Sequence, residues 1–240
     1  MSSSSSDSDI VRSISPPLVK TLFFHHPGTM TVSGPTGCGK THFVKRVIQH
    51  SMFRDDNDRP INRVIWFHGT RPSDELIDKI TKYTGGRAEF YRGINEDLVR
   101  NGLDEKENNL LVIDDLMQEL SDKKILANIF TKGSHHSNCS VVYIVQNLFD
   151  RGRSSSTVAK NSHYTVVFKN ERALYEIRSL APQVLPAGRG RDFSELFERI
   201  TQAPFSYLVL DCHPRSNKNE KFRSDIFPGE ETKIYVPNQV

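Results

Sequence analysis

The chain is poor in the features that mark secreted and membrane proteins. It has three cysteines in 240 residues, and no two of them have the C-x-x-C spacing of a metal or redox motif. No apolar stretch is long enough to cross a membrane, and no signal peptide is recognisable. We therefore expect an intracellular protein with reduced thiols and no membrane partner.

An excess of charge of one sign is also lacking. The 32 lysines and arginines nearly balance the 29 aspartates and glutamates, which leaves a net charge of +3. Such a balance neither requires nor excludes a nucleic-acid partner. A prediction of such a partner must therefore rest on where the charged residues lie along the sequence. With 36% hydrophobic residues the chain can build a core, and we expect one domain with extensions.

Histidine and cysteine do not combine into a metal motif. The pairs His25-His26 and His135-His136, with Cys139 near the second pair, lack the H-x₃₋₅-H or C-x₂₋₄-C spacing of a tetrahedral zinc site. Adjacent histidines also point in divergent directions. We therefore expect these residues to lie in polar loops or at helix ends.

What the chain does have is a complete phosphate-binding loop. Residues 34–41 match the Walker A pattern G-x-x-x-x-G-K-[ST], in which backbone N–H groups surround the phosphates. Lys40 is expected to reach the β- and γ-phosphates, and the Thr41 hydroxyl to ligate Mg²⁺. The sequence therefore predicts binding of ATP or GTP. Cys38 is expected only to fill space in the loop with its small side chain. The predicted nucleotide-binding residues are Gly34, Pro35, Thr36, Gly37, Cys38, Gly39, Lys40 and Thr41.

Strand-like and helix-like runs alternate along the chain. A strand over 29–33 precedes the loop and a helix-like run over 41–48 follows it, as a phosphate loop requires. Further short, β-branched and almost continuously apolar runs lie at 63–67, 110–113, 141–145, 164–168 and 207–210. Helix-like segments lie near 72–83, 121–131, 171–181 and 193–200. This rhythm predicts an α/β fold with a mainly parallel central sheet flanked by helices.

The two ends of the chain differ in composition from its middle. The opening run, Met1 to Asp9, is almost entirely serine and aspartate and lacks apolar groups. The last residues are polar and contain proline and lysine. We expect a disordered tail over 1–20, a P-loop ATPase domain over 21–212 and a polar extension over 213–240.

Two carboxylates end a predicted central strand. Leu110 to Ile113 are apolar and are followed by Asp114 and Asp115, the pattern of a Walker B strand. Asp114 is expected to hold Mg²⁺, directly or through water. Asp115 is expected to orient and deprotonate the water that attacks the γ-phosphate, unless it only caps the following helix. Two acids favour a hydrolase over a kinase.

Further catalytic candidates follow the next strands. Gln146 directly follows the run 141–145 and could sense the γ-phosphate. Alternatively, its amide only completes the hydrogen bonds at the end of the strand. Arg172, Arg151 and Arg153, ranked in that order, are candidates for an arginine that enters a neighbouring subunit's site. Each could equally be a surface or DNA-contacting arginine.

Positive charge is concentrated between residues 150 and 191. This segment has eight basic residues against three acidic ones. A local excess of positive charge beside a Gly/Ser-rich loop is typical of a protein that moves along the phosphate backbone of a nucleic acid without reading its bases. A solvated surface of the protein would have the same composition. The basic residues are Arg151, Arg153, Lys160, Lys169, Arg172, Arg178, Arg189 and Arg191.

Taken together, four blocks resemble the poxvirus-type DNA-packaging ATPases, in the FtsK/HerA group of P-loop ATPases. They span roughly residues 28–212, and the third, which ends its strand in Gln-Asn-Leu-Phe, is the most specific. In this chain the second block has Asp-Asp where many members of the wider group have Asp-Glu, so the second carboxylate is shorter. The blocks are GPTGCGKT (34–41), VIDDLM (112–117), GSHHSNCSVVYIVQNLF (133–149) and AKNSHYTVVFKNER (159–172).

The resemblance implies a RecA-like P-loop NTPase that hydrolyses ATP with Mg²⁺ as a homo-oligomeric ring. It also implies movement of double-stranded DNA, held by its backbone without sequence specificity, into a capsid with a capsid or portal protein as partner. The host nucleus or a cytoplasmic virus-assembly site would then be the location. The catalytic residues carried over are Lys40, Asp114, Asp115 and Gln146, with Thr41 and Asp114 at the metal.

Two other functions compete with DNA packaging. An AAA+ or helicase-type replication ATPase would need a helical lid after the sheet, and residues 171–240 look too short and too mixed for one. A nucleotide-dependent assembly switch would bind ATP without significant hydrolysis, which the paired aspartates disfavour. A small-molecule kinase would need a substrate lid, and none is recognisable.

Overall fold

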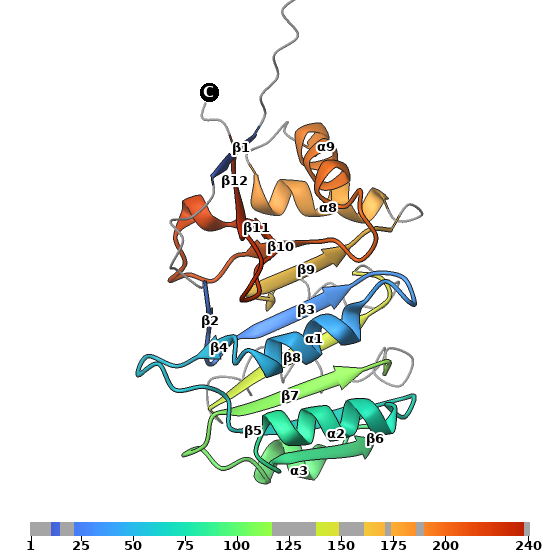
Figure 1. The fold of residues 1–240 in the computed structure, drawn as a ribbon, viewed down its shortest axis with the longest axis vertical. Coiled ribbons are helices and arrows are strands. Elements are labelled where there is room, and N and C mark those ends of the chain that lie inside the picture. The colour runs from blue at the N-terminus through green and yellow to red at the C-terminus, as the bar shows by residue number, and fades with distance from the viewer. Residues whose placement is uncertain are drawn as a thin grey trace, which may run out of the picture.

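The computed structural model describes residues 11–14, 22–116, 138–148, 161–170, 174–185 and 190–237. Within these residues the chain forms one large twisted sheet with helices on both faces (Figure 1). A small parallel pair, β2 (Phe24–His25) and β4 (Phe53–Arg54), lies beside it.

The large sheet has ten strands in the order β1-β12-β11-β10-β9-β3-β8-β7-β5-β6. The block from β9 to β6 is parallel, and the strands from β10 to β1 continue it antiparallel. In chain order the strands are β1 (Val11–Ile14), β3 (Thr29–Ser33), β5 (Arg63–His68), β6 (Ala88–Arg92), β7 (Asn109–Asp114), β8 (Cys139–Val145), β9 (Tyr164–Phe168), β10 (Tyr207–Asp211), β11 (Phe222–Ser224) and β12 (Lys233–Pro237).

Helices cover the sheet because its strands are apolar on both faces. On one face, Val64, Trp66 and Val112 pack with residues of α1 (Lys40–Gln49) and α2 (Asp74–Tyr83). On the other face, alternate residues such as Ile65 and Ile113 pack with α3 (Glu96–Asn101), and strands nearer β11 pack with α8 (Leu174–Val184) and α9 (Gly190–Ile200). A short 3₁₀ turn, η2 (Lys218–Glu220), precedes β11.

The predicted fold class is confirmed. Every run predicted as a strand forms one, with bounds that differ by one or two residues at most. The helices predicted near 41–48, 72–83, 171–181 and 193–200 are also present, whereas the one predicted near 121–131 lies outside the described residues.

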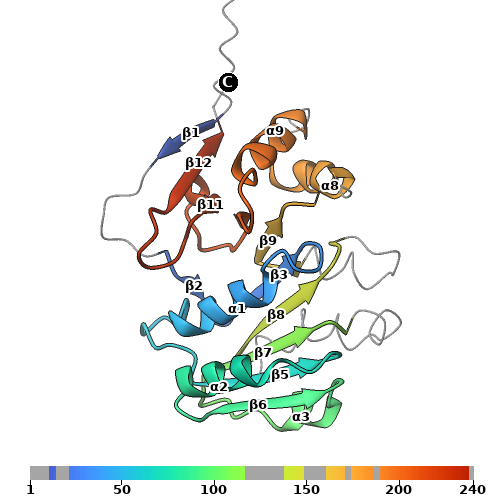
Figure 2. The same ribbon diagram turned by 45° about the vertical axis from the view of Figure 1, so that its right-hand side comes forward.

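The predicted segment boundaries differ from the structure at both ends. Residues Val11–Ile14, expected in a disordered tail, form β1 and pair antiparallel with β12, so the first and last strands of the described residues lie side by side (Figure 2). Residues 213–240 were expected to form a polar extension, but β11 and β12 belong to the main sheet and Ile226 and Phe227 are buried in its core. The domain therefore extends beyond residue 212, because apolar residues in this short polar segment complete the core.

Candidate nucleotide-binding and hydrolysis site

The phosphate loop connects β3 to α1 as the sequence predicts. Gly39 is the residue before the helix and has a φ of 104°, a left-handed conformation that glycine adopts without the steric cost of a side chain. The Phe43 N–H then donates to the Gly39 carbonyl at 2.9 Å, which starts the helical ladder. The loop's N–H groups and the first turn of α1 are therefore arranged as an anion-binding site.

Lys40 is held within the loop. Its Nζ donates hydrogen bonds to the carbonyl oxygens of Gly34 at 2.7 Å and Pro35 at 2.9 Å. Burial lowers the pKa of this amine, and the negative charges of Asp114 and Asp115 act in the opposite direction. The thiol of Cys38 has a raised pKa because it is partly buried, which fits its expected role as filler.

Strand β8 separates the phosphate loop from the Walker B acids. It pairs with β3 on one side, where Ser33 is opposite Val145, and with β7 on the other, where Asp114 is opposite Ile144. All three strands are parallel, so their carboxyl ends meet at one edge of the sheet. Gln146, which directly follows β8 and is exposed, therefore lies between the loop and the two aspartates.

Asp114 has the properties of a cation ligand. Burial raises the pKa of its carboxyl to about 6, with a further contribution from the charge of Asp115 and an opposing one from Lys40. A nearby cation stabilises the charged form of such a partly buried carboxylate. Thr41 lies in the first turn of α1, so a hydroxyl and a carboxylate supply the hard oxygen ligands that Mg²⁺ prefers, and the residues present fit this metal.

Asp115 is oriented by the segment that follows β5. The hydroxyl of Thr70 donates to its Oδ2 at 3.0 Å, and the residue has a φ of 55°. Gly69 makes this approach possible: a Cβ there would lie 2.1 Å from the Asp115 carbonyl oxygen. The Gly69 N–H in turn donates to the Asp114 carbonyl at 3.0 Å. The second acid is therefore fixed by β5 as well as by its own strand.

Sequence reasoning missed two residues at this edge. Thr70 holds Asp115 from 45 positions away, and nothing local marks it. His68 ends β5 directly opposite Asp114 and is buried, and burial together with Arg71 and Arg92 lowers the pKa of its imidazole. The sequence could have indicated His68, because a histidine that directly follows an apolar strand run lies at the same edge of the sheet as the Walker B acids.

Several sequence predictions fall outside the described residues. Arg172, Arg151 and Arg153 all do, as does the pair His135-His136. Of the first pair, His25 stacks on His213 with ring centroids 4.5 Å apart, while His26 is buried and bonds Ser140 Oγ through Nδ1 at 2.7 Å. Within the described part of the chain no group of three or more His, Cys, Asp and Glu side chains could hold a metal ion. In the same residues no helix is long and apolar enough to cross a membrane.

The fold and the site define a RecA-like P-loop NTPase. The chain belongs to the NB-ARC domain family, which matches residues 12–145, more than half of its length. This match ends with β8, so β9 and the antiparallel strands lie beyond it. Comparison with curated protein sequences gives no significant match.

Solved structures with similar folds include two viral packaging proteins and a KaiC-like protein. B204, the DNA-packaging ATPase from Sulfolobus turreted icosahedral virus, is 12% identical with a TM-score of 0.51, over 90% of this chain and 100% of that one. Its counterpart from Sulfolobus turreted icosahedral virus 2, in complex with sulfate, is 14% identical with a TM-score of 0.49, over 88% and 97%. The KaiC-like protein PH0186 from Pyrococcus horikoshii OT3 is 14% identical with a TM-score of 0.49, over 95% and 100%. At this identity the similarity to B204 shows a common fold.

Proposed function

We propose that the chain is an ATP-hydrolysing motor that moves double-stranded DNA and packages a viral or virus-like genome into capsids. The observation that best supports ATP hydrolysis is the placement of β8 between the strand before the phosphate loop and the Walker B strand. This order brings Lys40, Gln146 and the two aspartates to one edge of the sheet, where each has a distinct part in breaking a phosphate bond.

The chemistry follows from these positions. Lys40 leaves the loop carbonyls and binds the β- and γ-phosphates. Thr41 and Asp114 would hold Mg²⁺, which would offset the charge of the transferring phosphoryl group. Asp115, oriented by Thr70, accepts a proton from the attacking water as the bond from the γ-phosphorus to the bridging oxygen breaks. Gln146 positions this water. The products are ADP and phosphate.

Support for the DNA substrate comes from motifs and from surface charge. The four sequence blocks resemble packaging ATPases, and the viral packaging ATPase B204 has a similar fold. Of the basic residues between 150 and 191, Lys169, Arg178 and Arg191 are described, and all three are exposed on β9, α8 and α9 or directly beside them. Exposed cations of this kind suit contacts with backbone phosphates, which carry no sequence information.

The proposed assembly is a homo-oligomeric ring, with a capsid or portal protein as its partner at the site of virus assembly. In such a ring an arginine of one subunit completes the site of the next, and Arg172 is the first candidate. An AAA+ lid is disfavoured by the described residues after β9, because they form α8, α9 and three strands that extend the sheet.

Displacement of a triplex-forming oligonucleotide from duplex DNA tests the motor directly. We expect the assembled protein to displace the third strand with ATP and Mg²⁺, and the Lys40→Ala and Asp115→Asn variants to leave it in place. ATP hydrolysis by the wild type without any displacement would contradict translocation. Tight ATP binding with no hydrolysis would instead favour the assembly switch.

A further inference from the structure

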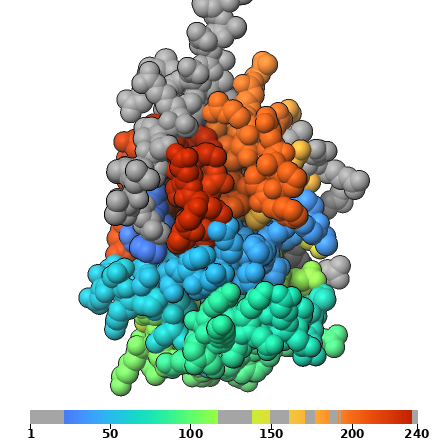
Figure 3. Space-filling view, viewed as in Figure 1, coloured from blue at the N-terminus to red at the C-terminus, as the bar shows by residue number. Residues whose placement is uncertain are grey.

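A second feature of the molecule lies beside the phosphate loop, on the face of the sheet that α1 covers. It is a cavity of about 550 Å³, between α1, the end of β9, the turn before β10 and the segment after β11. Five of the residues that line it are phenylalanine or tyrosine: Phe43, Phe168, Phe205, Tyr207 and Phe227. Figure 3 shows the C-terminal strand segments and the α8–α9 segment lying directly above α1 on this side of the molecule.

The cavity is continuous with the phosphate loop. Gly39, the loop residue directly before α1, lines it, and a Cβ at this position would lie 3.4 Å from the Phe205 ring and 3.5 Å from the Phe168 ring. From Gly39 the floor continues along α1 to Arg46, about 10 Å further at 1.5 Å per residue. Phe168 of β9 and Tyr207 of β10 also line the cavity, and these strands lie on the opposite side of β3 from β8 and β7. A nucleotide with its γ-phosphate near Asp115 would therefore extend its base into the cavity.

Packing of apolar side chains does not explain the position of Phe205 in the wall of this cavity. It is 68% exposed, whereas the other exposed large apolar side chains of the described residues are 37% exposed. Its φ is 64°, a left-handed conformation that is unfavourable for an aromatic residue. A strained backbone that holds an aromatic ring in solvent indicates a functional position.

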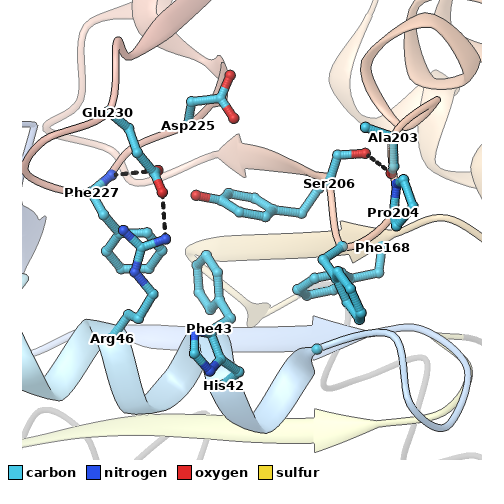
Figure 4. Close-up of a pocket in the computed structure, with 13 residues that line it drawn as sticks. His42, Phe43, Arg46, Phe168, Ala203, Pro204, Ser206, Asp225, Phe227 and Glu230 are labelled. Atoms are coloured by element: carbon cyan, nitrogen blue, oxygen red, sulfur yellow. Dashed lines mark hydrogen bonds and ion pairs between the residues drawn. The ribbon is translucent and has the colours of Figure 1, made fainter.

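Six side chains bring polar groups to the cavity: His42, Arg46, Ser206, Tyr207, Asp225 and Glu230. Glu230 forms an ion pair with Arg46 and accepts the Phe227 N–H at 3.3 Å, and the Arg46 guanidinium lies 4.1 Å from the Phe227 ring centroid. On the opposite side the Ser206 hydroxyl donates to the Ala203 carbonyl at 2.6 Å. Figure 4 shows Phe43 between these two sides, projecting from α1. An apolar cavity with oriented polar groups at its edge has the character of a site for a flat heteroaromatic ligand.

We propose that this cavity binds the purine base of the nucleoside triphosphate, with Phe205 stacked on one face of the base. The proposal rests on the proposed function, because it requires the triphosphate to occupy the phosphate loop. It assigns a role to residues 203–230, which supply Phe205, Tyr207, Phe227 and Glu230 to the nucleotide site. A base stacks on an aromatic ring through its π face, which gives affinity for purines over the smaller pyrimidines.

Calorimetric titration separates the base from the phosphates. A non-hydrolysable ATP analogue, the matching UTP analogue and inorganic tripolyphosphate would be titrated, each with Mg²⁺, into the wild type, Phe205→Ala, Phe205→Tyr and Lys40→Ala. Phe23→Ala is the matched control, because Phe23 is also an exposed phenylalanine but lies beside Arg54, next to the β2–β4 pair.

We expect Phe205→Ala to weaken binding of the ATP analogue at least about tenfold, the loss of one base-stacking contact, and to leave tripolyphosphate affinity unchanged. Phe205→Tyr and Phe23→Ala should bind both ligands as the wild type does, and Lys40→Ala should lose both. The wild type should bind the ATP analogue more tightly than the UTP analogue.

Three results would overturn the purine pocket: unchanged ATP-analogue affinity in Phe205→Ala, an equal loss of ATP-analogue and tripolyphosphate affinity, or equal wild-type affinity for the two nucleotides. Each of them leaves the phosphate loop intact as a site. A wild type that binds none of the three ligands would overturn the proposed function itself, and this inference with it.

Discussion

Thr70 Oγ1 donates a 3.0 Å hydrogen bond to Oδ2 of Asp115 and so connects the segment after β5 to the end of the Walker B strand. Because Asp115 is exposed and has a left-handed backbone, this contact and the close approach of Gly69 decide where its carboxylate points. The orientation of the expected base is therefore a property of two neighbouring strands.

Replacing Thr70 with valine should remove this hydrogen bond at nearly constant volume. We expect kcat for ATP hydrolysis to fall about tenfold, because a hydrogen bond to a charged group is lost, while nucleotide affinity stays unchanged. Thr70→Ser keeps the hydroxyl and should restore the rate. Steady-state phosphate release checks this, and equal kcat in the valine variant and the wild type would show that Asp115 needs no such support.

Asp115→Asn keeps the size of the side chain but removes the base. This variant should bind ATP normally and hydrolyse it at least about a hundredfold more slowly. Asp115→Glu should preserve or raise the rate, since the longer carboxylate reaches further. Single-turnover hydrolysis with binding measured in parallel separates the two effects, and near-normal turnover by the asparagine variant would assign the base to another residue.

The sequence predicts the strands that are buried on both faces, because such strands are continuous apolar runs. The edge strand β6 and the short antiparallel strand β11 escape this test. β6 is a half-exposed edge strand containing Glu89 and Arg92, and β11 contains Arg223, which is buried only because it forms an ion pair with Asp211. A charged residue whose partner is distant in sequence resembles a loop residue until the fold is known.

The same distinction applies to the site. The phosphate loop and the Walker B acids are contiguous motifs, so the sequence identifies them. The contact of Thr70 with Asp115 joins residues 45 positions apart, and the cavity beside Gly39 is closed by residues as distant as Glu230. Such relationships depend on how strands are ordered in the sheet, which no local pattern specifies.

The ring arrangement predicts that one subunit completes the site of another. An Arg172→Ala subunit lacks the arginine but has an intact loop, while a Lys40→Ala subunit lacks the loop amine but still offers its arginine. Neither should hydrolyse ATP alone, and a mixture of the two should. Arg100→Ala, on the exposed side of α3, is the control and should be active by itself. An inactive mixture would remove Arg172 from this role.

His26 should make stability depend on pH. Burial lowers the pKa of its imidazole from 6.5 to about 4, so below pH 6.5 the unfolded chain binds a proton that the folded protein does not. Its contribution is therefore fully present above pH 6.5 and is lost as the pH falls toward 4, by up to about 3 kcal/mol. Urea unfolding of the wild type and His26→Gln checks this, and identical slopes of stability against pH would contradict it.

The most direct test of the account is the rate of phosphate release from ATP with and without duplex DNA at low salt, with Mg²⁺ present throughout. We expect the wild type to hydrolyse ATP, duplex DNA to raise the rate several-fold irrespective of sequence, and Lys40→Ala and Asp115→Asn to abolish the activity in both conditions. A wild-type rate that is the same with and without saturating DNA, or no higher than that of Lys40→Ala, would contradict a DNA-translocating ATPase.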